Sequence, residues 1–138
     1  MIDEKRVVLI AEDEDDLREM YTMALTGKGF EVLQAVNGIE VLDLLEKRYT
    51  EVDLILLDIV MPGMDGFEAL KKIKKDERFG NIPLLVSTNL DNEEDRREAL
   101  GMGALEYFVK SQHTPSELVA KVDAILARDE SAVNRRIV

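Results

Sequence analysis

Five short apolar runs are spaced along the chain, and a segment with helical periodicity follows each of them. Runs of this length suit β-strands, and a continuous apolar run is typical of a strand buried on both faces of a parallel sheet. The alternation therefore predicts an open, doubly wound α/β fold, with parallel strands, helices on two faces and right-handed crossovers. The predicted strands are Arg6–Ala11, Phe30–Ala35, Leu54–Leu57, Ile82–Ser87 and Leu105–Val109.

Most of the helical segments begin with the same local signal. An Asn, Asp or Thr residue is followed three residues later by Glu, which is the pattern of a capping box at a helix start. Local and global signals therefore agree along the chain. The pattern occurs at Asn37–Glu40, Asp65–Glu68, Asp91–Glu94 and Thr114–Glu117.

Composition excludes several classes of function. The net charge of −11 argues against non-specific nucleic-acid binding, which needs a basic surface. With no cysteine, disulfides, thiolate metal sites and a catalytic thiol are excluded. We expect neither a signal peptide nor a membrane span, and therefore a cytoplasmic protein. The 138 residues predict one domain over residues 1–128 and a short C-terminal tail over residues 129–138.

Polar side chains follow four of the predicted strands at the point where each strand ends. Because the carboxyl ends of parallel strands meet at one edge of the sheet, we expect these side chains to lie close together, where ligands bind in such folds. The second strand ends without such residues, as an edge strand would. The residues in question are Glu12, Asp13, Asp58, Ser87, Thr88 and Lys110.

Three carboxylates at one edge repel one another unless a cation lies among them. Oxygen ligands suit a hard divalent ion, and Mg²⁺ commonly takes one or two carboxylates, water and a phosphate. A lysine and a hydroxyl are the groups that the remaining phosphoryl oxygens need. The residues thus predict metal-assisted phosphoryl transfer, with a carboxylate as candidate nucleophile.

Four segments together resemble the receiver domain of two-component response regulators, and the resemblance extends over residues 5 to 127. Within that family, the chain resembles single-domain regulators of the chemotaxis type. The resemblance implies a flavodoxin-like sheet with strand order 2-1-3-4-5. The segments that carry it are Val8–Glu14, Leu56–Gly66, Val86–Ser87 and Gly103–Lys110.

The resemblance also implies roles for individual residues. Asp58 is expected to be the phosphoacceptor, which takes its phosphoryl group from the phosphohistidine of a histidine kinase or phosphotransfer protein. Asp13 is expected to hold Mg²⁺ together with Asp58 and the backbone carbonyl of Val60, and Glu12 to assist directly or through water. The domain is then a signalling module, and not an enzyme beyond its own phosphorylation and dephosphorylation.

Three further roles concern the response to the phosphoryl group. The resemblance implies that Ser87 bonds to this group and shifts inward, and that Lys110 pairs with the acyl phosphate. Tyr107 is implied to be an aromatic switch, although a tyrosine in a strand is also an ordinary half-buried residue. The output face, which binds an unidentified downstream protein, is expected to comprise the fourth helix, the fifth strand and the fifth helix.

The sequence departs from the family pattern in several places. Ser111 stands where the family usually has proline after the lysine, so we expect a trans peptide bond there. Thr88 stands where alanine or glycine usually follows the hydroxyl residue, so either Ser87 or Thr88 is a candidate partner of the phosphate. Val60 and Asn89 hold positions that influence hydrolysis of the acyl phosphate, and apolar Val60 predicts a long-lived phosphoryl group.

Two other functions fit the same fold. A phosphoaspartate phosphatase also uses an aspartate at a strand end with Mg²⁺, but it normally has a second acid two residues further on, where this chain has Val60. An interaction domain that works without phosphorylation is the other alternative, and Ser111 and Thr88 make it plausible. The acids that follow Asp13 are Glu14, Asp15 and Asp16. They are explained as the solvated start of a helix, where the helix dipole favours negative charge.

Overall fold

All five predicted strands form one parallel sheet in the computed structural model, which describes residues 5–128. The predicted tail at residues 129–138 lies outside the described residues. The order β2-β1-β3-β4-β5 confirms the flavodoxin-like arrangement, with β2 at one edge. The strands are β1 (Val7–Ala11), β2 (Glu31–Ala35), β3 (Val52–Leu57), β4 (Leu84–Thr88) and β5 (Glu106–Val109).

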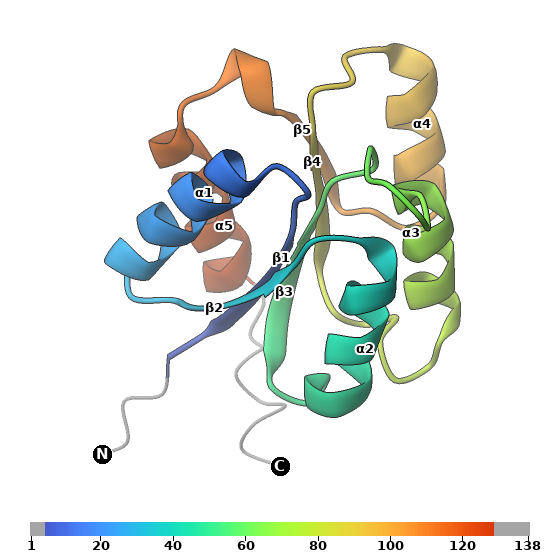
Figure 1. The fold of residues 1–138 in the computed structure, drawn as a ribbon, viewed down its shortest axis with the longest axis horizontal. Helices are drawn as coiled ribbons and strands as arrows, with labels where there is room; N and C mark the ends of the chain where they lie inside the picture. Colours follow the sequence, from blue (N-terminus) through green and yellow to red (C-terminus); the bar gives the residue numbers. More distant parts are fainter. Residues whose placement is uncertain (1–4, 129–138) are drawn as a thin grey trace.

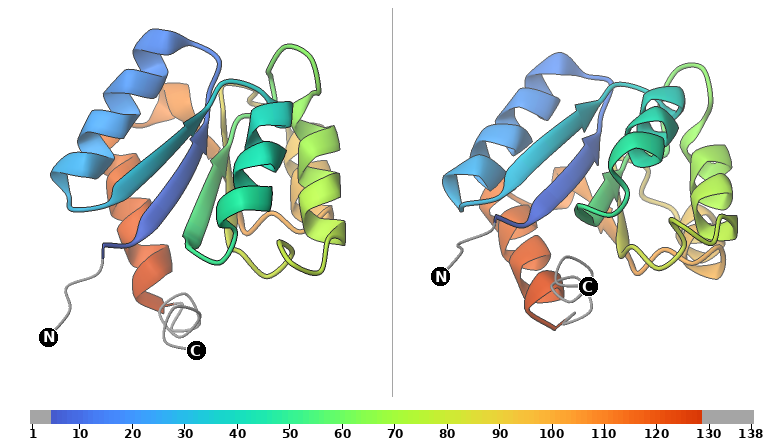
Figure 2. Two further views of the ribbon diagram at one scale, coloured as in Figure 1. Left: turned by 60° about the horizontal axis from the view of Figure 1, so that its bottom comes forward. Right: turned by 90° about the horizontal axis from the view of Figure 1, so that it is seen from below.

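Helices cover both faces of the sheet. Two of them, α1 and α5, lie on one face, and α2, α3 and α4 lie on the other (Figure 1, Figure 2). Within residues 5–128, no helix combines the length and the apolar character that a membrane span requires. The helices are α1 (Asp15–Gly27), α2 (Gly38–Arg48), α3 (Gly66–Lys75), α4 (Glu93–Gly101) and α5 (Pro115–Arg128).

The helix starts follow the predicted capping pattern with one shift. Three of the predicted caps accept a hydrogen bond from the backbone N–H three residues on: Asn37, Asp65 and Thr114. At α4 the cap is Asn92, which accepts from the backbone N–H of Asp95 at 2.8 Å. The prediction of Asp91 at this place was wrong by one residue, because two overlapping Asx-x-x-acid patterns stand side by side there.

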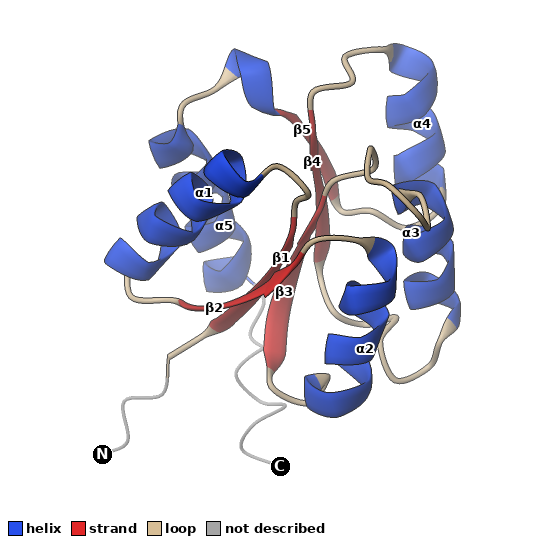
Figure 3. Cartoon of the chain, viewed as in Figure 1, coloured by secondary structure: helices blue, strands red, loops and turns tan. Residues whose placement is uncertain are grey.

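Strand alternation divides the core into two layers. Val8 and Ile10 of β1 pack under α1 and α5, whereas Leu9 packs under the helices of the other face. All five residues of β1 are buried, as predicted for a strand covered on both sides. The loops that follow the strands gather at the carboxyl end of the sheet (Figure 3). Polar side chains can therefore converge at this end.

Candidate functional site

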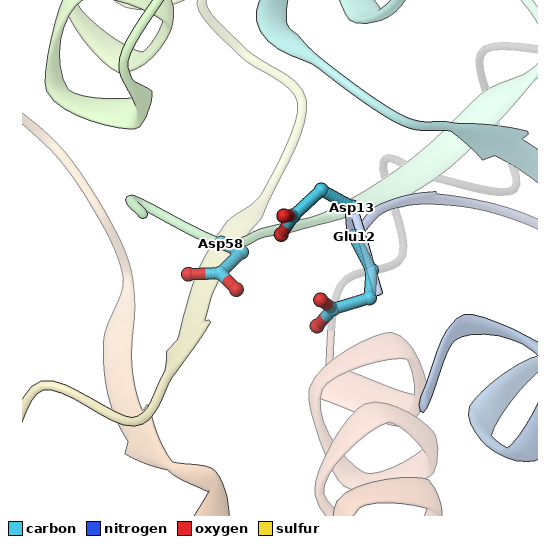
Figure 4. A group of neighbouring side chains, drawn as sticks. All are labelled: Glu12, Asp13 and Asp58. Carbon is cyan, nitrogen blue, oxygen red and sulfur yellow. The ribbon is translucent and has the colours of Figure 1, made fainter. Parts of the chain in front are cut away.

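Three carboxylates meet at the carboxyl edge of the sheet. Glu12 and Asp13 directly follow β1, and Asp58 directly follows β3 (Figure 4). Each offers one oxygen that lies within 4.8 Å of the others. Asp58 and Glu12 are only 6% and 2% exposed, whereas Asp13 is exposed. The structure therefore brings together the three acids that the sequence predicted at this edge.

Lys110 bridges two of these acids from the end of β5. Its Nζ donates a hydrogen bond to Asp58 Oδ2 at 3.0 Å and forms an ion pair with Glu12 Oε1. Burial alone would lower the pKa of Lys110, but the adjacent carboxylates of Asp58 and Glu12 hold it above its usual value. Lys110 also begins a short 3-10 turn, and its peptide bond to Ser111 is trans, as predicted.

Both carboxylate oxygens of Glu12 already have partners in the protein. Oε1 pairs with Lys110, and Oε2 accepts a hydrogen bond from the backbone N–H of Glu14 at 3.0 Å. Burial raises the pKa of Glu12, and the pairing with Lys110 offsets only part of this rise. Glu12 is therefore better placed to reach a cation through water than to coordinate it with both oxygens.

Asp58 is held by its own loop. Its Oδ1 accepts a hydrogen bond from the backbone N–H of Val60 at 2.9 Å, and Oδ2 faces Lys110. The remaining lone pairs of Asp58 and the exposed carboxylate of Asp13 form an all-oxygen set of hard ligands. The donor set fits Mg²⁺, because hard oxygen ligands with room for water are what this ion binds.

A cavity of about 230 Å³ opens beside these acids. It is large enough for a small anion with its water, and one basic and four acidic residues contribute to its wall. Of the two hydroxyl residues at the end of β4, the wall contains Thr88. The lining residues are Glu12, Asp13, Glu14, Leu17, Asp58, Val60, Thr88, Asn89, Leu90 and Lys110.

Ser87 lies on the opposite face of the sheet from Thr88. Ser87 is paired in register with Phe108, which belongs to the core layer under α1 and α5. Thr88 is paired with Val109, which belongs to the other layer. The expected placement of Ser87 in the site was thus wrong by one residue, and Thr88, the alternative hydroxyl, lines the cavity. Strict counting of side-chain alternation along β4 could have separated the two.

The peptide groups of Leu90 connect Thr88 to Tyr107. Thr88 Oγ1 accepts a hydrogen bond from the Leu90 N–H at 3.3 Å, and the Tyr107 hydroxyl donates to the Leu90 carbonyl at 2.7 Å. Tyr107 is buried, and this burial, together with nearby Asp95 and Asp91, raises its pKa to about 12. The hydroxyl therefore stays protonated at neutral pH and keeps its donor role.

Several residues at the site had no place in the sequence predictions. Leu90 and Leu17 line the cavity, and Arg18 of α1 contacts the backbone of Glu12. Leu90 follows Asn89 directly and could have been found by extending the strand-end search by one residue. The long side chain of Arg18 gives no such signal, because its direction depends on rotamers.

Known proteins match nearly the whole chain. The family model described as the response regulator receiver domain matches residues 8–123. The phosphate regulon transcriptional regulatory protein PhoB of Pseudomonas aeruginosa is 37% identical over 123 residues, and that of Escherichia coli is 35% identical over 123 residues. These matches cover 89% of this chain and 52% of each relative, so the chain spans about half the length of these relatives.

Solved structures agree with this match. The chemotaxis protein CheY4 of Vibrio cholerae has a TM-score of 0.80 and 29% identity, covering 88% of this chain and 98% of that chain. The receiver domain of the Francisella response regulator 1452 has a TM-score of 0.80 and 27% identity, covering 90% of this chain and 98% of that chain. The fold and the sequence thus point to one family.

Proposed function

We propose, from the premise that this chain belongs to the receiver-domain family of two-component response regulators, that Asp58 accepts a phosphoryl group from the phosphohistidine of a histidine kinase or phosphotransfer protein. Phosphorylation then changes the affinity of the domain for a downstream protein. The observation that carries this proposal is the contact between Asp58 and Lys110 beside Glu12 and Asp13 in one cavity.

The transfer step needs a positioned carboxylate and a compensated charge. An oxygen of Asp58 attacks phosphorus, the P–N bond of the phosphohistidine breaks, and the imidazole nitrogen keeps the bonding electron pair. The Val60 N–H and the Lys110 ammonium hold the two oxygens of Asp58 in place. Asp13, Asp58 and the Val60 carbonyl would hold Mg²⁺, with Glu12 reaching it through water, and the ion would supply positive charge to the phosphoryl oxygens.

The response would pass through Leu90. Thr88 Oγ1 now accepts from the Leu90 N–H, and its own O–H would donate to a phosphoryl group on Asp58, which would draw Thr88 toward that group and away from the Leu90 N–H. When that hydrogen bond is lost, the loop after β4 becomes easier to move, and with it the Leu90 carbonyl that holds Tyr107. Phosphorylation thereby shifts an existing equilibrium at the face made by α4, β5 and α5, which we propose as the output face.

The proposal is tested with a small phosphodonor. Incubation with acetyl phosphate and Mg²⁺ is expected to give a stable adduct of about 80 Da, one phosphoryl group, by intact mass spectrometry. The adduct is expected to disappear in Asp58→Asn and to persist in Asp53→Asn, because Asp53 is a buried aspartate at the opposite end of β3, where it accepts a hydrogen bond from the Val7 N–H at 2.8 Å. Continuous consumption of acetyl phosphate without an adduct would instead support a phosphatase, and no reaction at all would support a phosphorylation-independent interaction domain.

A pair of adjacent hydroxyl variants tests the placement of Thr88. Thr88→Val keeps the side-chain shape but removes one hydrogen bond to the phosphoryl group, so the rate of phosphorylation is expected to fall about tenfold. Ser87→Ala, on the opposite face, is expected to stay within about twofold of the parent rate. The rate of adduct formation measures both, and a larger loss in Ser87→Ala would return the role to Ser87.

The exposed side chain of Val60 predicts a long-lived phosphoryl group. Val60 is 52% exposed and lines the cavity, and its apolar side chain cannot orient a water for attack on the acyl phosphate. Val60→Gln is therefore expected to shorten the lifetime several-fold, because a polar side chain there can position that water. Decay of the adduct after removal of phosphodonor measures it. The control is Ile39→Gln, because Ile39 is a similarly exposed apolar residue away from the cavity. Decay of the adduct within seconds in the parent protein would contradict the prediction.

A further inference from the structure

The guanidinium of Arg18 joins the segment between β1 and α1 to strand β2, near the cluster of carboxylates. Nη1 donates to the backbone carbonyl of Glu12 at 2.9 Å, Nη2 contacts Asp15 Oδ1 at 2.6 Å, and Nε donates to Gln34 Oε1 at 3.1 Å. The side chain is only 16% exposed, although it belongs to the first turns of α1. Such a rigid fork, with a partner on each of its three nitrogens, orders the segments that it joins.

The main chain at Glu12 is thereby held on both sides. Its N–H donates to the carbonyl of Ala35 at 3.0 Å, and its carbonyl accepts from Arg18. That carbonyl belongs to the peptide group that links Glu12 to Asp13. The orientation of this peptide sets the direction in which the Asp13 side chain leaves the chain, since Asp13 is in a loop between β1 and α1.

We propose that Arg18 is a positioning residue for the divalent-cation site, a role that rests on the proposed function. Arg18 fixes the Glu12–Asp13 peptide before the cation binds, so that the Asp13 carboxylate already faces Asp58. Without Arg18, the cation itself would have to order the loop, and affinity would fall. Loss of such a supporting contact around a metal site typically weakens metal binding about 10–100-fold.

Electrostatics alone predicts the opposite effect of removing Arg18 on Mg²⁺ affinity, so an affinity measurement can distinguish the two explanations. Arg18 is a cation that contacts the backbone of the loop carrying Glu12 and Asp13, so its charge repels a divalent ion bound there. If Arg18 acted by charge alone, its removal would tighten Mg²⁺ binding. If Arg18 acts by positioning, its removal weakens binding in spite of the more negative surroundings.

The test measures Mg²⁺ affinity by titration calorimetry, without a phosphodonor. Arg18→Met is expected to bind Mg²⁺ about tenfold more weakly than the parent chain, and Arg18→Lys to show an intermediate loss, because lysine can donate to the Glu12 carbonyl but lacks the fork. Gln34→Ala removes the Nε contact alone and is expected to bind within about twofold of the parent. Hydrogen exchange in the metal-free protein is expected to be faster at the backbone amides of residues 13 and 14 in Arg18→Met.

A second measurement separates this proposal from the proposed function. At saturating Mg²⁺, phosphorylation of Arg18→Met by acetyl phosphate is expected to return close to the parent rate, because only metal affinity has been lost. Unchanged or tighter Mg²⁺ binding in Arg18→Met would overturn the positioning role alone. A parent chain that binds no Mg²⁺ and forms no adduct would overturn the proposed function as well.

Discussion

Replacing Gly66 with alanine is expected to lower the free energy of unfolding by about 3 kcal/mol. A Cβ at Gly66 would lie 2.1 Å from Ile59 Cα and 2.5 Å from the backbone oxygen of Asp58. Both are main-chain atoms in a packed loop, so no side-chain rotation relieves the overlap. Either the start of α3 or the loop after β3 has to move.

The same movement reaches the site, because Ile59 lies between Asp58 and Val60. We expect Gly66→Ala to be phosphorylated more slowly than the parent chain, even at a temperature at which the variant remains folded. Urea denaturation gives the stability change, and adduct formation gives the rate. Gly27→Ala is the matched control, since nothing lies within 4 Å of a Cβ there and the position ends a helix. A midpoint for Gly66→Ala equal to that of Gly27→Ala would contradict the prediction.

Replacing Lys110 with methionine is expected to destabilise the metal-free protein by about 3–5 kcal/mol at pH 8, because it leaves a buried carboxylate without its counter-ion. Glu12 is 2% exposed and pairs with Lys110. The control is Lys121→Met, which breaks a half-exposed pair with Glu106 and should change stability by less than about 1 kcal/mol. Urea midpoints in the presence of a chelator measure both.

The loss in Lys110→Met is expected to depend on pH. Burial already raises the pKa of Glu12 above its value in the unfolded chain, and removal of the opposing Lys110 raises it further. A raised folded-state pKa means that the penalty is absent when both states are protonated and grows as the pH rises through the folded-state pKa. The stability gap between variant and parent should therefore shrink from pH 8 toward pH 5. A pH-independent gap, or a gap that the second change Glu12→Gln leaves in place, would contradict this account.

The strand order was implied by the family resemblance and is confirmed, whereas the convergence of Asp13, Asp58 and Lys110 could be predicted from the residues themselves. Each buried strand is an apolar run of limited length, and each of these side chains directly follows a strand. In a parallel sheet that position alone is enough to bring them to one edge. The capping pattern at Asn37 and Asp65 is equally local and was confirmed.

Features that depend on counting or on side-chain direction could not be predicted in the same way. The predicted fourth strand began at Ile82 and ended at Ser87, whereas β4 runs from Leu84 to Thr88. Neighbouring side chains of a strand point to opposite faces, so placing the end of the strand one residue early favoured the wrong hydroxyl. The engagement of both Glu12 oxygens arises from contacts between segments far apart in the sequence, which no local pattern reports.

The pairing of Lys110 with Glu12 and Asp58 has a consequence for how the domain depends on its surroundings. The ammonium group already balances part of the negative charge at the carboxyl end of the sheet, so we expect the chain to fold without a cation. In structural zinc domains, by contrast, metal binding and folding are one event. If the domain works as we propose, a scarcity of Mg²⁺ would leave the amount of folded receiver unchanged and reduce only the fraction that can be phosphorylated, so that metal supply would adjust the signal without exposing the chain to degradation.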